Sequence, residues 1–309
     1  MNHSSSPVPR TSSDGARSCG GSVLVTGASG NVGGAVVRSL IAAGVPVRPA
    51  GTDPVRLAAR HPELAPVRLD LHDPSTFAPA LRGAAGLFLV RPPAISRVGP
   101  TLGALVDAAR DAGVGHVVFS SVTGADSNPL VPHHRVEARV RACPSWTILR
   151  PGFFAQNLAD AYREDIVAAD RLCLPAGSGR AAFIDTRDIG DVAATVFRDP
   201  AAHHAAGYTL TGPEALDLDQ VAAVLTAELG RPISYRPAAA LGYAAHLRRA
   251  GLPMAQVAVQ TVLHVGLRRG QAAEVDPTVQ RLLGRPGRTL AEYVHDHRDL
   301  WAVPAPARW

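Results

Sequence analysis

The sequence predicts an α/β fold of the Rossmann type, in which a doubly wound parallel sheet is followed by a smaller, mostly helical C-terminal lobe. Short apolar runs rich in β-branched residues alternate with longer helical stretches through the first half of the chain. A glycine-rich segment lies directly between the first apolar run and the first helical stretch. The chain has 309 residues, of which 46% are hydrophobic, so it can bury a full core.

Six buried strands are expected in the first half, because each run is short, apolar and bounded by turn residues. They cover residues 22–26, 45–49, 66–69, 86–90, 116–120 and 146–150. The helices expected between them cover residues 32–43, 54–60, 74–81, 98–111 and 132–142. Such a sheet binds its ligands at the carboxyl ends of the strands.

The regular alternation of predicted strands and helices ends after Arg150. Helices are expected at 153–170, 187–198 and 218–229, strands at 181–184 and 208–211, and mostly helix from there to residue 309. This half cannot form a second nucleotide fold, so we expect a lobe that closes over the sheet edge. The expected division is a disordered tail (1–20), a Rossmann core (21–152) and a lobe (153–309) interleaved with the last core elements at about 181–212.

The composition argues against several classes of protein. No apolar run approaches the roughly 20 residues that span a bilayer, and the first 20 residues lack the apolar core of a signal peptide, so a cytoplasmic protein is expected. The net charge of +5 arises from scattered arginines, so no nucleic-acid partner is expected. Cys19, Cys143 and Cys173 are too scattered for a disulfide framework or a metal site. The chain contains no lysine.

Residues 26–33 have the form of a dinucleotide-binding loop, with a strand before them and a helix after them. Gly27 allows the turn, Gly30 allows close approach of the backbone to a pyrophosphate, and Gly33 lets the helix pack on the sheet. The residues expected to hold the cofactor in this loop are Gly27, Ser29, Gly30, Asn31, Val32 and Gly33.

The glycine spacing resembles the loop of extended and atypical short-chain dehydrogenases. The resemblance continues in residues 69–71 (LDL), 87–93 (LFLVRPP), 116–121 (HVVFSS), 147–157 (TILRPGFFAQN), 183–193 (FIDTRDIGDVA) and 208–213 (YTLTGP). Together these segments resemble the NmrA-like branch, which includes quinone reductases, isoflavone-type reductases and redox-sensing regulators. The resemblance covers about residues 21–300 and implies a nicotinamide cofactor. The further cofactor contacts that it implies come from Thr52, Asp70, Leu71, Val90, Arg91, Ser120, Pro151 and Phe153.

The end of the second strand discriminates between the two nicotinamide cofactors. A carboxylate there binds the ribose 2′-hydroxyl of NAD, whereas an arginine pairs with the 2′-phosphate of NADP. NmrA-like reductases commonly carry an arginine before the Asp-Pro pair, and Thr52 takes that place here. Asp53 is expected to cap the next helix instead. Arg38, Arg48 or Arg56 could approach, so NADP(H) is favoured over NAD(H), although weak cofactor binding is also open.

Without lysine, the chain cannot have the Tyr/Lys pair with which most short-chain dehydrogenases protonate a carbonyl oxygen. His133 and Glu137 stand in its place and resemble the His-x-x-x-Glu of quinone reductase members. His133 is expected to donate a proton or hydrogen bond, with Glu137 orienting it one helical turn away. Alternatively, both residues lie on a solvated helix face. Ser121 is expected to bind a reacting oxygen, or else only to satisfy loop amides.

Several residues are expected to shape the substrate cleft. An aromatic pair after the sixth strand suits a flat ring, although such a pair is as often part of a core. Arg91 is unusual at the end of the fourth strand and could meet an anionic or phenolic substrate. The expected substrate residues are Phe154, Asn157, Arg91 and Tyr162.

The leading hypothesis is an NAD(P)H-dependent reductase of a quinone or conjugated aromatic. A tailoring enzyme that couples, cyclises or isomerises an aromatic polyketide and a non-catalytic redox sensor are the alternatives. The lysine-free, Ala/Arg/Pro-rich composition is typical of genomes in which such genes tailor natural products. The expected partner is a small aromatic molecule, and a homodimer is one possible oligomeric state.

Overall fold

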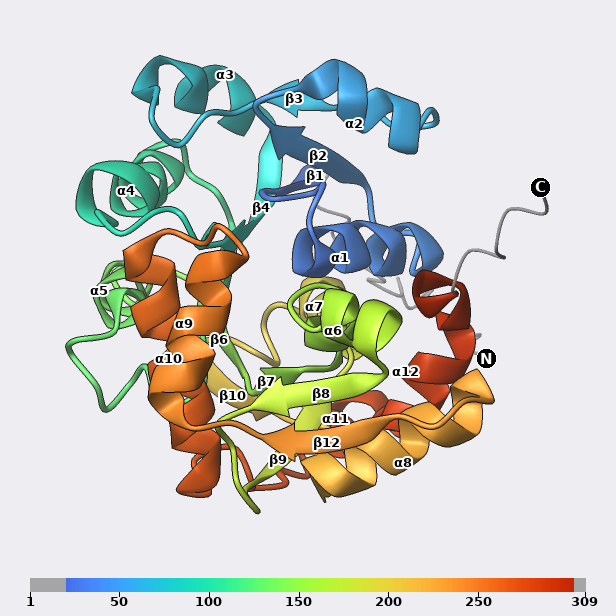
Figure 1. Ribbon diagram of the computed structural model, residues 1–309. Helices are drawn as coiled ribbons and strands as arrows, with labels where there is room; N and C mark the ends of the chain where they lie inside the picture. The colour runs from blue at the N-terminus through green and yellow to red at the C-terminus, as the bar shows by residue number, and fades with distance from the viewer. Residues whose placement is uncertain (1–20, 303–309) are drawn as a thin grey trace, which may run out of the picture.

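The computed structural model describes residues 21–302 and confirms the predicted Rossmann-type α/β fold (Figure 1). The main sheet has seven parallel strands in the order β10-β6-β5-β4-β1-β2-β3. The expected disordered tail, with Cys19, lies outside the described residues. The strands are β1 (Ser22–Val25), β2 (Val47–Gly51), β3 (Val67–Arg68), β4 (Ala84–Val90), β5 (His116–Ser120), β6 (Trp146–Pro151) and β10 (Ala206–Leu210).

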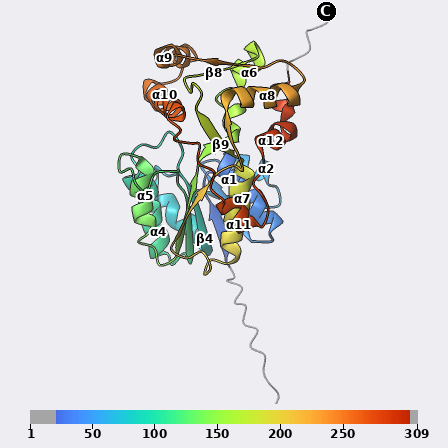
Figure 2. The same cartoon turned by 90° about the horizontal axis from the view of Figure 1, so that it is seen from below.

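Helices cover both faces of this sheet, which explains why its strands are apolar throughout (Figure 2). Leu87 and Leu89 of β4 pack into one core, whereas Phe88 between them packs into the other. The first face carries α3 (Phe77–Leu81), α4 (Ala104–Asp111) and α5 (Pro132–Val140). The second face carries α1 (Asn31–Ala42), α2 (Pro54–Arg60), α7 (Thr186–Arg198) and α11 (Thr278–Leu283).

A smaller lobe stands over the carboxyl edge of the sheet, because the chain leaves β6 and enters the lobe at once (Figures 1 and 2). It is less purely helical than expected, since it contains two small sheets with the orders β11-β9-β7 and β12-β8. Its strands are β7 (Phe153–Phe154), β8 (Arg171–Leu174), β9 (Arg180–Ile184), β11 (Ala215–Asp217) and β12 (Ser234–Pro237). Its helices are α6 (Arg163–Ala169), α8 (Leu218–Leu229), α9 (Ala240–Arg249), α10 (Met254–Arg268) and α12 (Leu290–Asp296).

The helix expected over residues 153–170 is wrong. Phe153 and Phe154 pair in parallel with Phe183 and Ile184 of β9, so the aromatic residues adopt an extended backbone that their β-propensity favours. A short 3₁₀ turn (Ala155–Leu158) follows, and only α6 is α-helical. The strand expected near residue 181, as part of the return to the Rossmann core, belongs to the lobe sheet instead.

Short turns complete the described chain: 3₁₀ segments at Pro74–Thr76 and Arg298–Trp301, and a π-helical turn at Gly99–Gly103 before α4. No helix between residues 21 and 302 combines the length and apolarity needed to cross a bilayer.

Candidate active site

The glycine loop connects β1 to α1 and is tied to the end of β4. The Thr26 amide donates to the Phe88 carbonyl at 3.0 Å, and the Thr26 hydroxyl accepts from the Val90 amide at 3.0 Å. Gly27 has a φ of +61°, and a Cβ there would lie 2.5 Å from Val90 Cγ1. A Cβ at Gly33 would lie 2.3 Å from the Gly27 carbonyl oxygen. Glycine is therefore required at position 27 for the loop to pass so close to β4, and at position 33 for α1 to start so close to the loop.

The first turn of α1 offers backbone N–H groups to an anion. The helix begins after Gly30 without a side-chain cap, and its first turn contains no acidic residue. Amides at a helix start carry partial positive charge. Ser29, Gly30 and Asn31 are exposed, whereas Val32 is buried against the sheet. A cradle that side chains at the glycines would fill fits the pyrophosphate of a dinucleotide.

The residues expected on the adenosine side follow the ends of β2 and β3. Thr52 is exposed, and the Asp53 carboxylate accepts from the Arg56 amide at 2.9 Å, which caps α2 as predicted. The Asp70 carboxylate accepts a backbone amide two residues on at 2.9 Å, and Leu71 is buried. Each carboxylate thus has one oxygen, Oδ1, engaged by the backbone.

Arg48 and Arg60 differ in whether their guanidinium groups lie near the glycine loop. Arg48 cannot serve the cofactor as expected, because its guanidinium donates to Ser22 Oγ at 2.7 Å and to the Arg82 carbonyl at 2.9 Å, at the amino end of the sheet. Arg60 at the end of α2, which was not among the expected residues, donates from Nη1 to the Ser29 carbonyl oxygen at 2.8 Å. A guanidinium thus lies beside the glycine loop, and no local signal indicated it, because its partner is 31 residues away in the sequence.

Arg91 and His133 meet beyond the carboxyl end of β4. Arg91 Nε donates to His133 Nε2 at 3.2 Å, and Arg91 Nη1 donates to the Ile95 carbonyl at 2.6 Å. The imidazole stacks on Phe119 with 6.0 Å between ring centroids. Burial, and then the charge of Arg91, lower the pKa of His133 to about 4, so the ring is neutral at pH 7.

The proton of the His133 imidazole is fixed by this contact. Because Nε2 accepts from Arg91, the neutral ring carries its proton on Nδ1. Nδ1 is buried and has no hydrogen-bond partner among the described residues. A buried donor without a partner is costly, and an oxygen acceptor placed there would satisfy it.

Glu137 does not orient His133, and the alternative of a solvated helix face is also wrong. The Glu137 carboxylate is fully buried and accepts two hydrogen bonds from Arg150, at 2.9 and 2.8 Å. It also accepts from Arg141 Nη2 at 2.6 Å and from Ser121 Oγ at 2.6 Å. Burial alone would raise its pKa, but the hydrogen bonds and the arginine charges hold the pKa of Glu137 below its usual value. Glu137 therefore ties α5 to β5 and β6, because its side chain points at the sheet rather than along the helix.

The remaining expected residues follow the ends of β5 and β6. Ser120 is buried in the sheet edge, as is Pro151. Since the Ser121 hydroxyl donates to Glu137, it can only accept from a ligand. Half-buried at the start of the lobe lie Phe153, Phe154 and Asn157.

Tyr162 is placed inside the lobe core. It is 5% exposed, and its hydroxyl is hydrogen-bonded to Nε2 of the equally buried His264, whose Nδ1 donates to the Gln260 carbonyl at 2.7 Å. Tyr243 stacks edge-on against the same imidazole, with 5.3 Å between ring centroids. The hydroxyl of Tyr162 is thus already partnered within the lobe.

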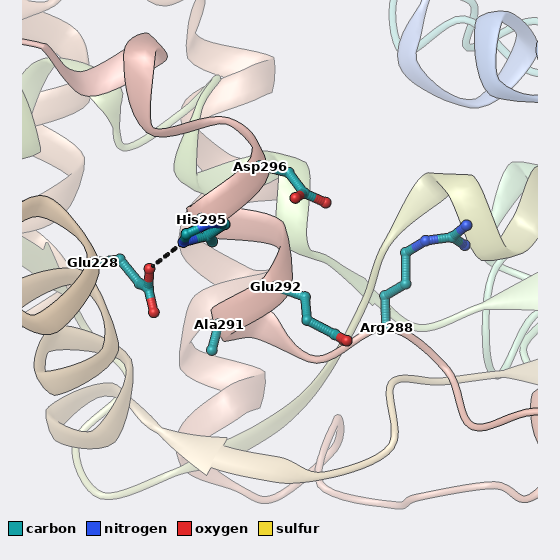
Figure 3. A pocket seen from close by; sticks show the side chains of 6 residues that line it. All are labelled: Glu228, Arg288, Ala291, Glu292, His295 and Asp296. Carbon is teal, nitrogen blue, oxygen red and sulfur yellow. Dashed lines mark hydrogen bonds and ion pairs between the residues drawn. The ribbon is translucent and has the colours of Figure 1, made fainter.

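An open hollow on the lobe surface lies between α8 and α12 (Figure 3). Its walls carry charge, and the carboxylate of Glu228 faces His295 Nδ1 at 3.0 Å. An apolar ring would find little to pack against there. Within residues 21–302, no group of three side chains is arranged to hold a metal ion. The hollow is lined by Glu228, Arg288, Ala291, Glu292, His295 and Asp296.

Gly33→Ala is expected to weaken dinucleotide binding strongly and to cost roughly 2 kcal/mol of stability, because the new methyl group must displace the backbone of the loop. Isothermal titration with NADPH and thermal unfolding measure the two effects. Gly242→Ala on the exposed face of α9, where nothing lies within 4 Å, is the control and should stabilise by about 1 kcal/mol. Unchanged NADPH affinity in Gly33→Ala would contradict the assignment of the cradle.

Glu137→Gln is expected to destabilise the protein by roughly 3 kcal/mol, because it leaves the charge of Arg150 with only the half-exposed carboxylate of Asp126, 3.7 Å away. Urea denaturation measures this loss. Asp111→Asn, which removes a carboxylate that is 70% exposed, is the matched control and should leave stability nearly unchanged. Equal urea midpoints for wild type and Glu137→Gln would show that the buried cluster does not hold α5 in place.

Known proteins resemble this chain along most of its length. NAD(P)H azoreductase of Xenophilus azovorans is 34% identical over 283 residues, which cover 89% of this chain and 97% of that relative. Quinone oxidoreductase 2 of Escherichia coli (strain K12) is 29% identical and covers 88% of this chain and 97% of its own length.

Solved structures share the fold. The NADPH-dependent quinone oxidoreductase of Escherichia coli in complex with NADPH has a TM-score of 0.80 and 27% identity, covering 89% of this chain and 99% of that one. Triphenylmethane reductase of Citrobacter sp. in complex with NADP(H) has a TM-score of 0.79 over the same shares, and at 23% identity it shows the fold alone. Residues 20–261 match the sequence model of the NmrA-like family. As the resemblance predicted, the chain belongs to the NmrA-like family.

Proposed function

We propose that this protein is an NAD(P)H-dependent reductase of a quinone or another conjugated aromatic molecule. The observation that carries the proposal is a cofactor cradle after β1 together with an unpartnered imidazole N–H on α5, which Arg91 contacts from the end of the neighbouring strand β4. The names of two relatives, an azoreductase and a quinone oxidoreductase, support this class of reaction.

The bound nicotinamide would supply a hydride, and the residues of the chain would place the acceptor and stabilise its oxygen. His133 would direct the proton on Nδ1 at the oxygen that gains negative charge. Because its pKa is about 4, the ring would act at pH 7 as a neutral donor rather than as an imidazolium acid. A hydroquinone anion is delocalised over its ring, so a hydrogen bond followed by protonation from water is sufficient.

The other predicted catalytic residues, Glu137 and Ser121, would position His133 without contacting the substrate. Glu137 would fix α5, and thereby His133, through its bonds to Arg150 and Ser121. Ser121 would contribute to this anchoring rather than donate to the substrate. Phe154 and Asn157 would line the cleft where the lobe begins, with Tyr162 supporting it from the lobe core.

Charges beside the glycine loop favour NADP(H) over NAD(H). The Asp53 carboxylate caps α2 through Oδ1, which directs the side chain at the helix amides. Arg60 lies at the Ser29 carbonyl, and Arg56 is exposed on the same helix. A 2′-phosphate would pair with these guanidinium groups through charge-assisted hydrogen bonds. The solved quinone oxidoreductase holds NADPH, which supports the same preference.

The test follows the absorbance of reduced nicotinamide when the protein is mixed with NADPH or NADH and 1,4-naphthoquinone. NADPH should be consumed faster than NADH. Arg60→Gln should lower kcat/KM with NADPH about tenfold, the loss of one charge-assisted hydrogen bond, and leave NADH turnover unchanged. Arg82→Gln, an exposed arginine at the far end of the sheet, is the control and should change neither.

Two results would contradict the proposal in different ways. If calorimetry shows binding but neither cofactor is consumed, the reductase function fails, and a tailoring enzyme or a redox sensor becomes the better hypothesis. If Arg60→Gln impairs NADPH and NADH equally, the argument for NADP(H) fails. A role in natural product biosynthesis and a homodimeric state remain predictions.

A further inference from the structure

Arg91 is a half-buried cation that lacks a carboxylate partner. Three other half-buried arginines pair with acids: Arg150 with Glu137, Arg187 with Asp185, and Arg285 with Asp188. Arg48 also has no acid partner, but it lies at the opposite end of the sheet. No acidic side chain within residues 21–302 forms an ion pair with Arg91, and burial lowers the pKa of its guanidinium. Partial burial of a charge without a counter-charge is unfavourable unless a ligand supplies one.

Hydrogen bonds hold the Arg91 guanidinium in one orientation, but they engage only two of its three nitrogens. Nε is bound to His133, and Nη1 is bound to the Ile95 carbonyl, with longer contacts to the carbonyls of Pro92 and Pro93. Nη2 has no hydrogen-bond partner in the described part of the chain, and it is not shielded from solvent. A fixed arginine with one free N–H₂ group is suited to a planar or tetrahedral oxyanion.

The direction of the side chain separates it from the expected path of the cofactor phosphates. In the sheet, β4 lies between β1, which carries the glycine loop, and β5. Arg91 reaches to His133 of α5, which follows β5, and thus turns away from the cradle. Because Nη2 lies beside Nε on the guanidinium, its free N–H₂ group lies close to the His133 imidazole.

We propose that Arg91 binds an anionic substituent, a carboxylate or a sulfonate, carried by the aromatic substrate. The proposal rests on the reductase function proposed above and deepens it by specifying the substrate class. The anionic group would pair with Nη2 while the reacting part of the same molecule lies against His133. Substrates without such a group would bind less tightly, because they would leave the guanidinium uncompensated.

The test measures binding, so it does not depend on turnover. Naphthalene-2-sulfonate and the neutral naphthalene-2-sulfonamide are titrated calorimetrically into protein saturated with NADP⁺. The sulfonate should bind the wild type at least about tenfold more tightly, as expected for one charge-assisted pair. Arg91→Gln should abolish this preference, and Arg91→Lys should retain part of it.

Arg97→Gln is the matched control, because Arg97 is exposed in the same loop and its loss changes the net charge equally. It should keep the preference of the wild type, and thermal unfolding verifies that each variant is folded. Equal affinities of the two probes for the wild type, absence of sulfonate binding, or an unchanged ratio in Arg91→Gln would overturn the proposal. A loss of NADP⁺ affinity in Arg91→Gln with no effect on the ratio would assign Arg91 to a cofactor phosphate instead. Quinone reduction without a sulfonate preference would leave the reductase function standing and remove only this inference.

Discussion

The loop that leaves β1 passes directly against the end of β4 because Gly27 carries no side chain, and α1 starts directly on that loop because Gly33 carries none. This close packing fixes the ends of two strands side by side, and the Thr26–Val90 hydrogen bond maintains their register. Arg91 follows Val90 in sequence and holds His133. A single series of short contacts therefore runs from the cofactor cradle to the imidazole, and no long flexible segment interrupts it.

The absence of lysine gives this site its electrostatic character. Arg60, Arg91 and Arg150 supply the positive charge near the sheet edge, and a guanidinium does not release its proton in proteins. These arginines can orient anions and carboxylates but cannot take part in proton transfer. Under the proposed function, His133 would contribute a hydrogen bond from a neutral ring, because burial lowers its pKa to about 4.

The sequence was sufficient to predict the elements whose signals are local. The run of apolar strands, the glycine loop and the Asp53 cap follow from periodicity and turn chemistry, and the structure agrees with them. The contacts of Glu137 were not predictable, because a spacing of four residues indicates a shared helix face but not which distant side chain meets it. The same reason explains the missed Arg60 and the lobe strand at Phe153, since both depend on partners far along the chain.

The protonation state of His133 is the central claim, and nitrogen NMR of histidine-labelled protein in complex with NADP⁺ tests it most directly. The His133 resonances are assigned by their loss in His133→Gln. A neutral ring with its proton on Nδ1 is predicted, with no titration between about pH 5.5 and 8, because the pKa of His133 lies near 4. A doubly protonated ring at pH 7, or a neutral ring with its proton on Nε2, would contradict the account.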